Sequence, residues 1–154
     1  MMPASYGLEP AKAETDLLPW SWAEERLALA RNYWLATVGA DGRPHVVPIW
    51  GIWRDGQLLF GTAMSSRKAR NMRRSTAAAV HLESGDEVVI LEGNTDEVVE
   101  PAALARFADT YQAKYVVRPQ VDDGETVIFR FTPATGMGWR EADFPTSATS
   151  WDLS

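Results

Sequence analysis

The sequence predicts one mainly β domain, an antiparallel β-barrel with two or three flanking helices. Six or seven short segments rich in β-branched and aromatic residues follow one another along the chain, and Gly and Asp turn signals separate them. Helical periodicity is confined to a few short stretches. With 154 residues, of which 45% are hydrophobic, the chain is long enough for a single domain with its own core. Short strands joined by tight turns are typical of antiparallel barrels.

The two ends of the chain differ in composition from its middle. Residues 1–19 show no hydrophobic period and are predicted to form a flexible arm, and residues 20–144 are expected to form the domain. Residues 145–154 are expected to form a tail that Trp151 anchors. The stretch Ser21–Glu24 has the pattern of a capping box, so a helix is expected to begin with Ser21 as its N-cap and to end near Arg31.

The remaining elements follow from turn signals and from the period of the apolar residues. Pro101 suits the first position of a longer helix, in which Phe107, Tyr111 and Tyr115 recur at helical spacing. A short helix is expected at residues 66–74. Strands are expected at residues 33–38, 44–53, 57–61, 77–82, 87–92, 95–99 and 126–131, and residues 137–140 extend the sheet.

The segment from His45 to Trp53 is apolar at nearly every position, so both of its faces need a cover. A flat ligand, a partner subunit or an ordinary buried environment would each supply one. Pro48 cannot donate a hydrogen bond to a neighbouring strand, which predicts an edge strand or a bulge at this point. An aromatic-rich edge of this kind is a candidate seat for a planar ring.

Several classes of function are disfavoured by composition. The net charge of −6 argues against nucleic-acid binding, and the absence of cysteine excludes disulfides and thiolate chemistry. The two histidines, His45 and His81, lie on different predicted strands without clustered carboxylates, so no metal site is expected. No membrane span and no signal peptide are expected, which is compatible with a cytoplasmic protein.

Five cations lie within eight residues, at positions 67, 68, 70, 73 and 74. With Ser65 or Ser66 as N-cap, Arg67 and Lys68 fall in the first turn of the short helix, where positive charge opposes the helix dipole. A bound phosphate would reverse that penalty, because backbone N–H groups, hydroxyls and cations would then converge on one anion. The alternative is an ordinary solvated basic face.

Four stretches, namely Tyr33–Val38, Asp41–Trp50, Phe60–Thr62 and Ser66–Asn71, resemble the flavin and deazaflavin oxidoreductases of the pyridoxamine 5'-phosphate oxidase-like superfamily. Within it, the chain is similar to the branch that uses the deazaflavin coenzyme F420. The resemblance spans about residues 20–140 and implies an FMN-binding split barrel. It also implies a homodimer with a cofactor site at each subunit interface and a small-molecule substrate. Trp139 and Arg140 are adjacent, unlike the spaced Trp and Arg of true pyridoxamine phosphate oxidases, so that particular activity is not expected.

The resemblance also assigns residues to the cofactor. It places the phosphate at Thr62, Ser66, Arg67 and Lys68, and it runs the ring along the backbone of the strand His45, Val46, Val47 and Pro48. Trp50 and Asn71 lie beside these motifs. Arg70 joins the candidate binding residues because Arg67, Arg70 and Arg74 can share one side of a helix. No residue is assigned a catalytic role.

Three hypotheses follow from the residues and the resemblance together. The first is an oxidoreductase that transfers a hydride from reduced F420 to a small organic substrate. The second is an FMN-dependent oxidoreductase of the same fold. The third is a protein that binds a cofactor or tetrapyrrole without turnover. The cofactor carries the chemistry in the first two, which agrees with the lack of an acid–base constellation. The arginine stripe favours F420, whose anionic tail continues beyond its phosphate.

Overall fold

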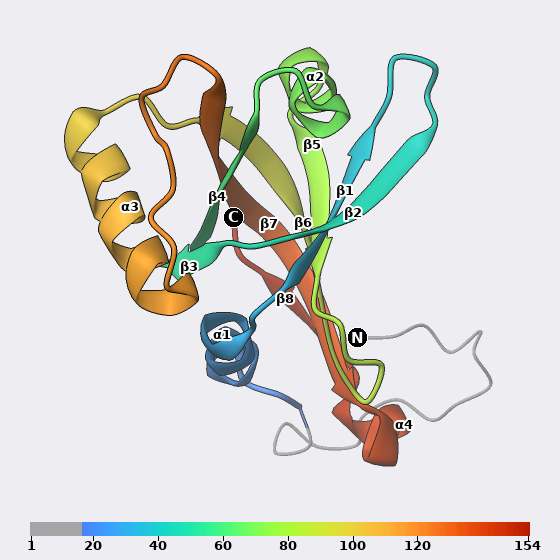
Figure 1. The fold of residues 1–154 in the computed structure, drawn as a ribbon. Coiled ribbons are helices and arrows are strands. Elements are labelled where there is room, and N and C mark those ends of the chain that lie inside the picture. Colours follow the sequence, from blue (N-terminus) through green and yellow to red (C-terminus); the bar gives the residue numbers. More distant parts are fainter. Residues whose placement is uncertain (1–16) are drawn as a thin grey trace.

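The structure, a computed structural model, describes residues 17–154 and contains one eight-stranded antiparallel sheet with helices around its margins (Figure 1). The helices are α1 (Trp20–Leu29), α2 (Arg67–Arg74), α3 (Pro101–Tyr115) and α4 (Phe144–Ser147), with a 3-10 turn η3 (Glu141–Asp143) before α4. The strands are β1 (Tyr33–Val38), β2 (Pro44–Ile49), β3 (Ile52–Arg54), β4 (Gln57–Ala63), β5 (Ala77–His81), β6 (Glu87–Glu97), β7 (Thr126–Arg140) and β8 (Thr149–Asp152).

The order of the strands makes the sheet curl into a split barrel. The path runs β2-β1-β5-β6-β7-β4-β3, so β2 and β3 form its two ends, yet only Trp50 and Gly51 separate them in the chain. A flat sheet would hold its end strands far apart, since neighbouring strands lie about 4.8 Å from each other. The two edges therefore approach each other at this short connection, which confirms the predicted fold class.

The predicted strand at residues 44–53 is wrong as a single element, because it breaks at Gly51. The Gly51 N–H donates to the hydroxyl of Tyr115 over 3.0 Å, and its carbonyl accepts from Lys114 Nζ over 2.9 Å. These contacts with α3 replace ladder bonds and turn the chain from one sheet edge to the other. Pro48 does lie on an edge strand, as its missing N–H predicts.

Strands β6 and β7 are longer than predicted, because each joins two segments that the sequence separates. A register shift between Glu92 and Gly93 absorbs the irregularity in β6, so residues 87–97 pair continuously with β7. A Cβ atom at Gly93 would lie 2.1 Å from the carbonyl oxygen of Thr132. Glycine is therefore required at this close approach, and it marks a bulge instead of the end of a strand.

Helix α1 begins one residue before the predicted capping box, with Pro19 as N-cap and no side-chain cap, so the prediction for Ser21 is wrong. Packing accounts for this start. Trp20 packs edge-on against Trp53 and Trp151, with ring centroids 6.2 and 5.3 Å away. Most of the predicted N-terminal arm, residues 1–16, lies outside the described residues.

Helices α2 and α3 agree with their sequence signals. Ser66 caps α2 through its hydroxyl, and Pro101 occupies the first turn of α3. Phe107 and Tyr115 of α3 are buried against Ile52 and Ile128 of the sheet. No helix among residues 17–154 is both long and apolar enough to cross a membrane.

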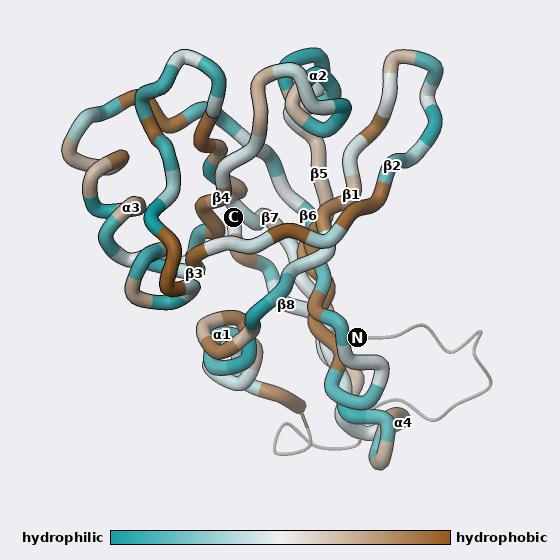
Figure 2. Tube along the Cα trace, viewed as in Figure 1, coloured by the Kyte–Doolittle hydropathy of each residue, from teal (hydrophilic) through white to brown (hydrophobic). Residues whose placement is uncertain are grey.

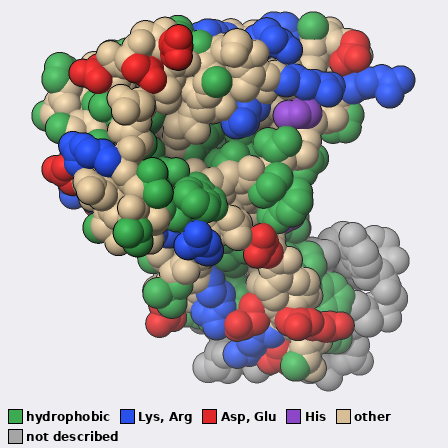
Figure 3. All heavy atoms as spheres, in the orientation of Figure 1, with side chains coloured by type: hydrophobic (Ala, Val, Ile, Leu, Met, Phe, Trp, Pro, Cys, Tyr) green, Lys and Arg blue, Asp and Glu red, His purple; other side chains and the backbone are tan. Residues whose placement is uncertain are grey.

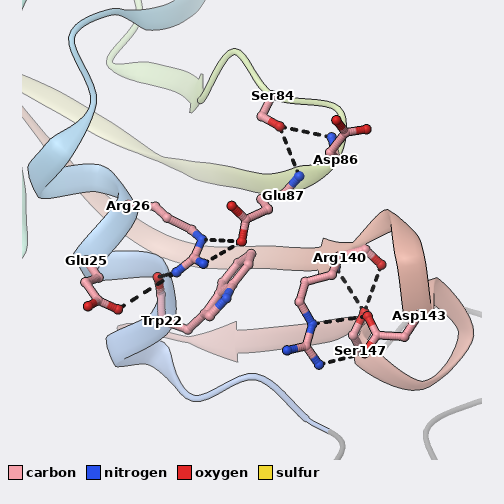
Figure 4. A network of polar contacts seen from close by, with 9 residues as sticks. All are labelled: Trp22, Glu25, Arg26, Ser84, Asp86, Glu87, Arg140, Asp143 and Ser147. Carbon is pink, nitrogen blue, oxygen red and sulfur yellow. Dashed lines mark hydrogen bonds and ion pairs between the residues drawn. The ribbon is translucent and has the colours of Figure 1, made fainter.

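The C-terminal residues contain a strand that the sequence analysis did not predict. Strand β8 pairs with β7, and the indole N–H of Trp151 donates to the carbonyl of Leu18 over 3.0 Å. Figure 4 shows ion pairs nearby. Arg26 of α1 bonds Glu87 at the start of β6, and Arg140 at the end of β7 bonds Asp143. These contacts fasten both ends of the described chain to the sheet.

The main core lies on the inner face of the curled sheet and includes Leu58 and Phe60 of β4 and Phe129 and Phe131 of β7, within hydrophobic stretches of the sheet that are brown in Figure 2. The outer face of β1, β2 and β5 is also largely apolar. Side-chain alternation and register place Trp34, Ala36, Val46, Pro48 and Ala79 on it together. The Val46 side chain is 50% exposed, so this face has no complete cover within the described chain.

Candidate functional site

The N-terminus of α2 is held by two hydroxyl groups. Ser66 Oγ accepts a hydrogen bond from the Ala69 N–H over 3.2 Å and lies 3.0 Å from Thr62 Oγ1 on β4. The N–H groups of Arg67 and Lys68 belong to the first turn, where a helix offers no internal acceptor. This end of α2 therefore presents free donors and the positive end of the helix dipole, which together suit an anion.

The cations of the described residues divide into two groups. One group pairs with carboxylates and comprises Arg26, Arg43, Arg73, Arg106, Arg118, Arg130 and Arg140. The other group makes no ion pair within residues 17–154 and comprises Arg31, Arg54, Arg67, Lys68, Arg70, Arg74 and Lys114. Four of the second group lie on α2, in a chain that carries 21 carboxylates. Cations left unpaired in so acidic a protein point to a bound anion.

His45 faces the same end of α2. It pairs with Thr37 across β1 and β2, and its buried Nδ1 atom has no hydrogen-bond partner among the described residues. Burial of the ring, and then the positive charges of Arg67 and Lys68, lower the pKa of His45. The imidazole is therefore neutral at neutral pH, and its Nδ1 has no committed partner among residues 17–154.

The predicted arginine stripe is real as a structural feature. Arg67, Arg70 and Arg74 line one hollow of about 450 Å³ between α2 and the turn that joins β1 to β2. Arg70 donates to the carbonyl of Ser65 over 3.0 Å, and Arg74 donates to that of Val38 over 2.8 Å. Figure 3 shows Lys and Arg side chains gathered around α2 with a histidine beside them, above a hollow with largely hydrophobic walls.

Lys68 and Arg73 differ from this stripe. Lys68 is half-buried, and that burial lowers the pKa of its ammonium group. Arg73 bonds Glu97 over 3.0 Å, so its charge is already compensated. Among the cations of α2, Lys68 in the first turn and the stripe of Arg67, Arg70 and Arg74 are therefore available to a ligand.

Asn71, a predicted cofactor-binding residue, is 6% exposed, and its amide nitrogen donates to Thr37 Oγ1 over 3.1 Å. This bond joins α2 to β1. Through it, Asn71 holds the basic helix at a fixed distance from the strand that pairs with β2.

Strand β2 offers an unpaired backbone edge beside these groups. Within residues 17–154 it pairs with β1 alone, so alternate N–H and C=O groups point away from the sheet. Its side chains alternate, with His45 and Val47 toward the inner face and Val46 and Pro48 toward the outer face. The backbone of this segment can thus bond the rim of a planar ring, while His45 and Val47 contact its face.

Sequence reasoning placed Trp50 near the cofactor motifs but did not connect it with the other residues that surround it where the two sheet edges meet. We call Arg31, Trp50, Lys114 and Tyr115 the seam cluster. Trp50 and Tyr115 stack in parallel with ring centroids 4.5 Å apart, and the Arg31 guanidinium lies 4.9 Å from the Trp50 ring. The helical spacing of Tyr115 predicted only a core position, and no local motif links residue 31 to residue 114.

Residues 23–140 match the family described as pyridoxamine 5'-phosphate oxidase. The chain belongs to this family. A search of curated proteins finds no significant match. Among solved structures, a conserved hypothetical protein from Mycobacterium tuberculosis is 28% identical, with a TM-score of 0.71, and the match covers 84% of this chain and 90% of that one.

Two further structures show how the fold is used by other proteins. An F420 reductase is 25% identical with a TM-score of 0.62, and the match covers 73% of this chain and 94% of that one. A heme-binding protein from Mycobacterium smegmatis shares the fold at 15% identity and a TM-score of 0.67, over 84% of this chain and 56% of that one. The resemblance seen in the sequence to the pyridoxamine 5'-phosphate oxidase-like split barrels is confirmed.

The site of this family member fits a cofactor that carries a phosphate. The N-terminus of α2 combines free N–H groups, the nearby hydroxyls of Ser66 and Thr62, and two cations without an ion pair among residues 17–154, and the neutral His45 and the edge of β2 lie near it. Within residues 17–154, no group of three or more His, Asp or Glu side chains could hold a metal ion.

Proposed function

We propose that this protein is an oxidoreductase that binds coenzyme F420 and uses its reduced form to deliver a hydride to a small organic substrate. The observation that carries the proposal is the pair of unpaired cations, Arg67 and Lys68, at the N-terminus of α2 in an acidic chain. The F420 reductase with the same fold at 25% identity supports it.

The N-terminus of α2 would hold the phosphate of the cofactor. Arg67 and Lys68 would supply charge-assisted hydrogen bonds, and their backbone N–H groups would add two further donors. Ser66 and Thr62 contribute by fixing the first turn, since their hydroxyls bond each other and the Ala69 N–H. An anion here also removes the unfavourable interaction between two first-turn cations and the helix dipole.

The edge of β2 would orient the ring. Backbone groups of the segment His45–Val47 point away from β1 and can bond polar atoms at the ring margin, and the neutral His45 adds one more nitrogen. Pro48 has no N–H and ends this row of donors. Bound reduced F420 supplies the hydride, so the protein's own tasks are positioning and the exclusion of water.

The stripe formed by Arg67, Arg70 and Arg74 supports F420 over FMN. FMN carries one phosphate, which the helix N-terminus alone can hold, whereas the tail of F420 carries further negative charges. The hollow between α2 and the β1–β2 turn continues from Arg67 toward Arg74 and would take that tail. FMN is the alternative cofactor, and the shared fold of a heme-binding protein supports binding without turnover as a second alternative.

The outer face of β1, β2 and β5 would join two copies of the chain, and the protein would work as a cytoplasmic homodimer. Val46 of β2 and Trp34 of β1 lie on that outer face, opposite to the side on which His45 and Val47 would contact the ring. The partner subunit would therefore lie close to the cofactor. Specific interfaces bury about 1,600 Å² in total, and an apolar sheet face provides a surface of suitable character.

Fluorescence titration of the purified protein with F420 and with FMN, at low and at high salt, tests the choice of cofactor. We expect F420 to bind more tightly, with an affinity that falls as salt rises, because the tail contacts are exposed to screening. Tighter binding of FMN at both salt concentrations, with no salt dependence for F420, would favour the FMN alternative.

A further inference from the structure

The seam cluster brings two cations together without a counter-charge. Arg31 lies over the rings of both Trp50 and Tyr115, at 4.9 and 5.6 Å from their centroids, and Lys114 lies 5.1 Å from the Tyr115 ring. Neither cation makes an ion pair with any carboxylate among residues 17–154. The positive charge of Arg31 lowers the pKa of Lys114, so the two like charges repel each other, and an anion bound beside them would relieve that repulsion.

Hydrogen bonds within the protein hold the side chains of Lys114 and Trp50 in place. Lys114 Nζ donates to the Tyr33 hydroxyl over 3.1 Å and to the Gly51 carbonyl over 2.9 Å, which leaves one of its three protons free. The Trp50 indole N–H donates to Asn32 Oδ1 over 3.1 Å, and this hydrogen bond fixes the ring over which the Arg31 guanidinium lies. A guanidinium stacked on an aromatic ring keeps its N–H fork directed away from the ring, in the geometry that accepts a carboxylate bidentately.

The seam cluster lies away from the N-terminus of α2, where the phosphate of the cofactor is proposed to bind. His45 and Trp50 are five residues apart along an extended chain, or about 16 Å. The arginine stripe continues from Arg67 to Arg74 along the β1–β2 turn, at the opposite end of β2 from Trp50. A cofactor tail that follows the stripe leads away from the seam, so it would leave the exposed Arg31 and Trp50 to a second molecule beside the ring.

We propose that the seam cluster is a substrate subsite that takes the carboxylate of a small planar organic acid. This proposal rests on the proposed function for its link to catalysis. Arg31 would bind the carboxylate as a fork, the free proton of Lys114 would point to the same anion, and the exposed part of Trp50 would contact the apolar body of the substrate. The proposed hydride transfer would thus be directed to anionic substrates.

The charge of Lys114 gives the subsite a pH dependence. Burial, and then the positive charge of Arg31, lower the pKa of Lys114 to about 8, while the Tyr33 hydroxyl of β1 bonds the amine and the Tyr115 ring of α3 lies beside it. A bound carboxylate favours the charged amine and raises that pKa. Affinity for a carboxylate should therefore fall as the pH rises through 8, when the free protein loses this proton.

Binding of benzoate to the cofactor-free protein tests the subsite, with uncharged benzamide as the matched probe. Calorimetry measures the affinity, and the indole ¹H–¹⁵N signal of Trp50 reports the place. We expect benzoate to shift that signal and to bind about tenfold or more tightly than benzamide. Arg31→Gln should remove the difference, whereas Arg43→Gln, which removes an exposed arginine paired with Asp41, should keep it.

Three results would overturn the proposal. Equal binding of benzoate and benzamide would exclude anion selection, and unchanged benzoate affinity in Arg31→Gln would exclude this cation. A loss of F420 affinity in Arg31→Gln, with FMN affinity unchanged, would assign the cluster to the cofactor tail. Because benzoate is measured without cofactor, failure of the subsite remains distinguishable from failure of F420 and FMN to bind at α2.

Discussion

Replacing the two first-turn cations of α2 should have opposite effects on cofactor binding and on the stability of the free protein. Arg67→Gln combined with Lys68→Met keeps the aliphatic stems of both side chains and removes both charges. Each charge-assisted hydrogen bond to a phosphate contributes about 1.5–3 kcal/mol, and Arg67 is exposed, so the lower value applies. Two such bonds amount to about 3 kcal/mol, or roughly a 100-fold weaker affinity.

The free protein should not lose stability in the same variant. A cation in the first turn opposes the helix dipole by about 0.3–1 kcal/mol, and neither charge has a carboxylate partner within residues 17–154. The free energy of unfolding in urea should therefore stay constant or rise by about 0.5–2 kcal/mol. Burial lowers the pKa of Lys68, which agrees with a charge that the folded state disfavours.

Arg73→Gln is the matched control, because Arg73 lies on the same helix but is paired with Glu97. Cofactor titration and urea unfolding are measured for both proteins. The control should keep its cofactor affinity within about threefold of that of the unchanged protein. If the double variant binds as tightly as this control, the phosphate does not lie at the N-terminus of α2 and the reasoning is refuted.

Three other changes test separate parts of the account. Asn71→Ala should lower the free energy of unfolding in urea by about 1–3 kcal/mol, because it leaves Thr37 without its buried partner; no loss would show that this bond does not hold α2. The free energy of unfolding should rise from about pH 8 toward pH 10, because Lys114 releases its proton near pH 8 in the folded protein and near pH 10.5 in the unfolded chain. Lys114→Met should flatten that rise, and an unaltered slope would contradict the lowered pKa of Lys114. Val46→Asp should give the monomer mass by light scattering, whereas a dimer that persists would exclude the outer sheet face as the interface.

The elements that the sequence predicts well are those with local signals. The hydroxyl of Ser66 and the ring of Pro101 act within one helical turn, and both mark helix starts that the structure confirms. Ser21 carries an equally good local signal, yet α1 begins at Trp20, because that side chain packs against Trp53 and Trp151. Contacts distant in sequence override a capping preference of about 1 kcal/mol.

The break at Gly51 was not predictable for the same reason. Its N–H and carbonyl bond Tyr115 and Lys114, which lie more than sixty residues further along the chain. The same contacts assemble the seam cluster, which no spacing in the sequence reveals. The cation cluster of α2 was visible because its five members lie within eight residues, although the sequence alone could not distinguish the paired Arg73 from the unpaired Arg67.

A crystal structure of the protein with F420 bound tests the central claim most directly. The account predicts the phosphate of the cofactor within hydrogen-bond distance of Lys68 and Arg67 at the N-terminus of α2, and the ring against the free edge of β2 at His45 and Val47. A phosphate bound elsewhere, with Arg67 and Lys68 still solvated and His45 Nδ1 still without a partner, would contradict it.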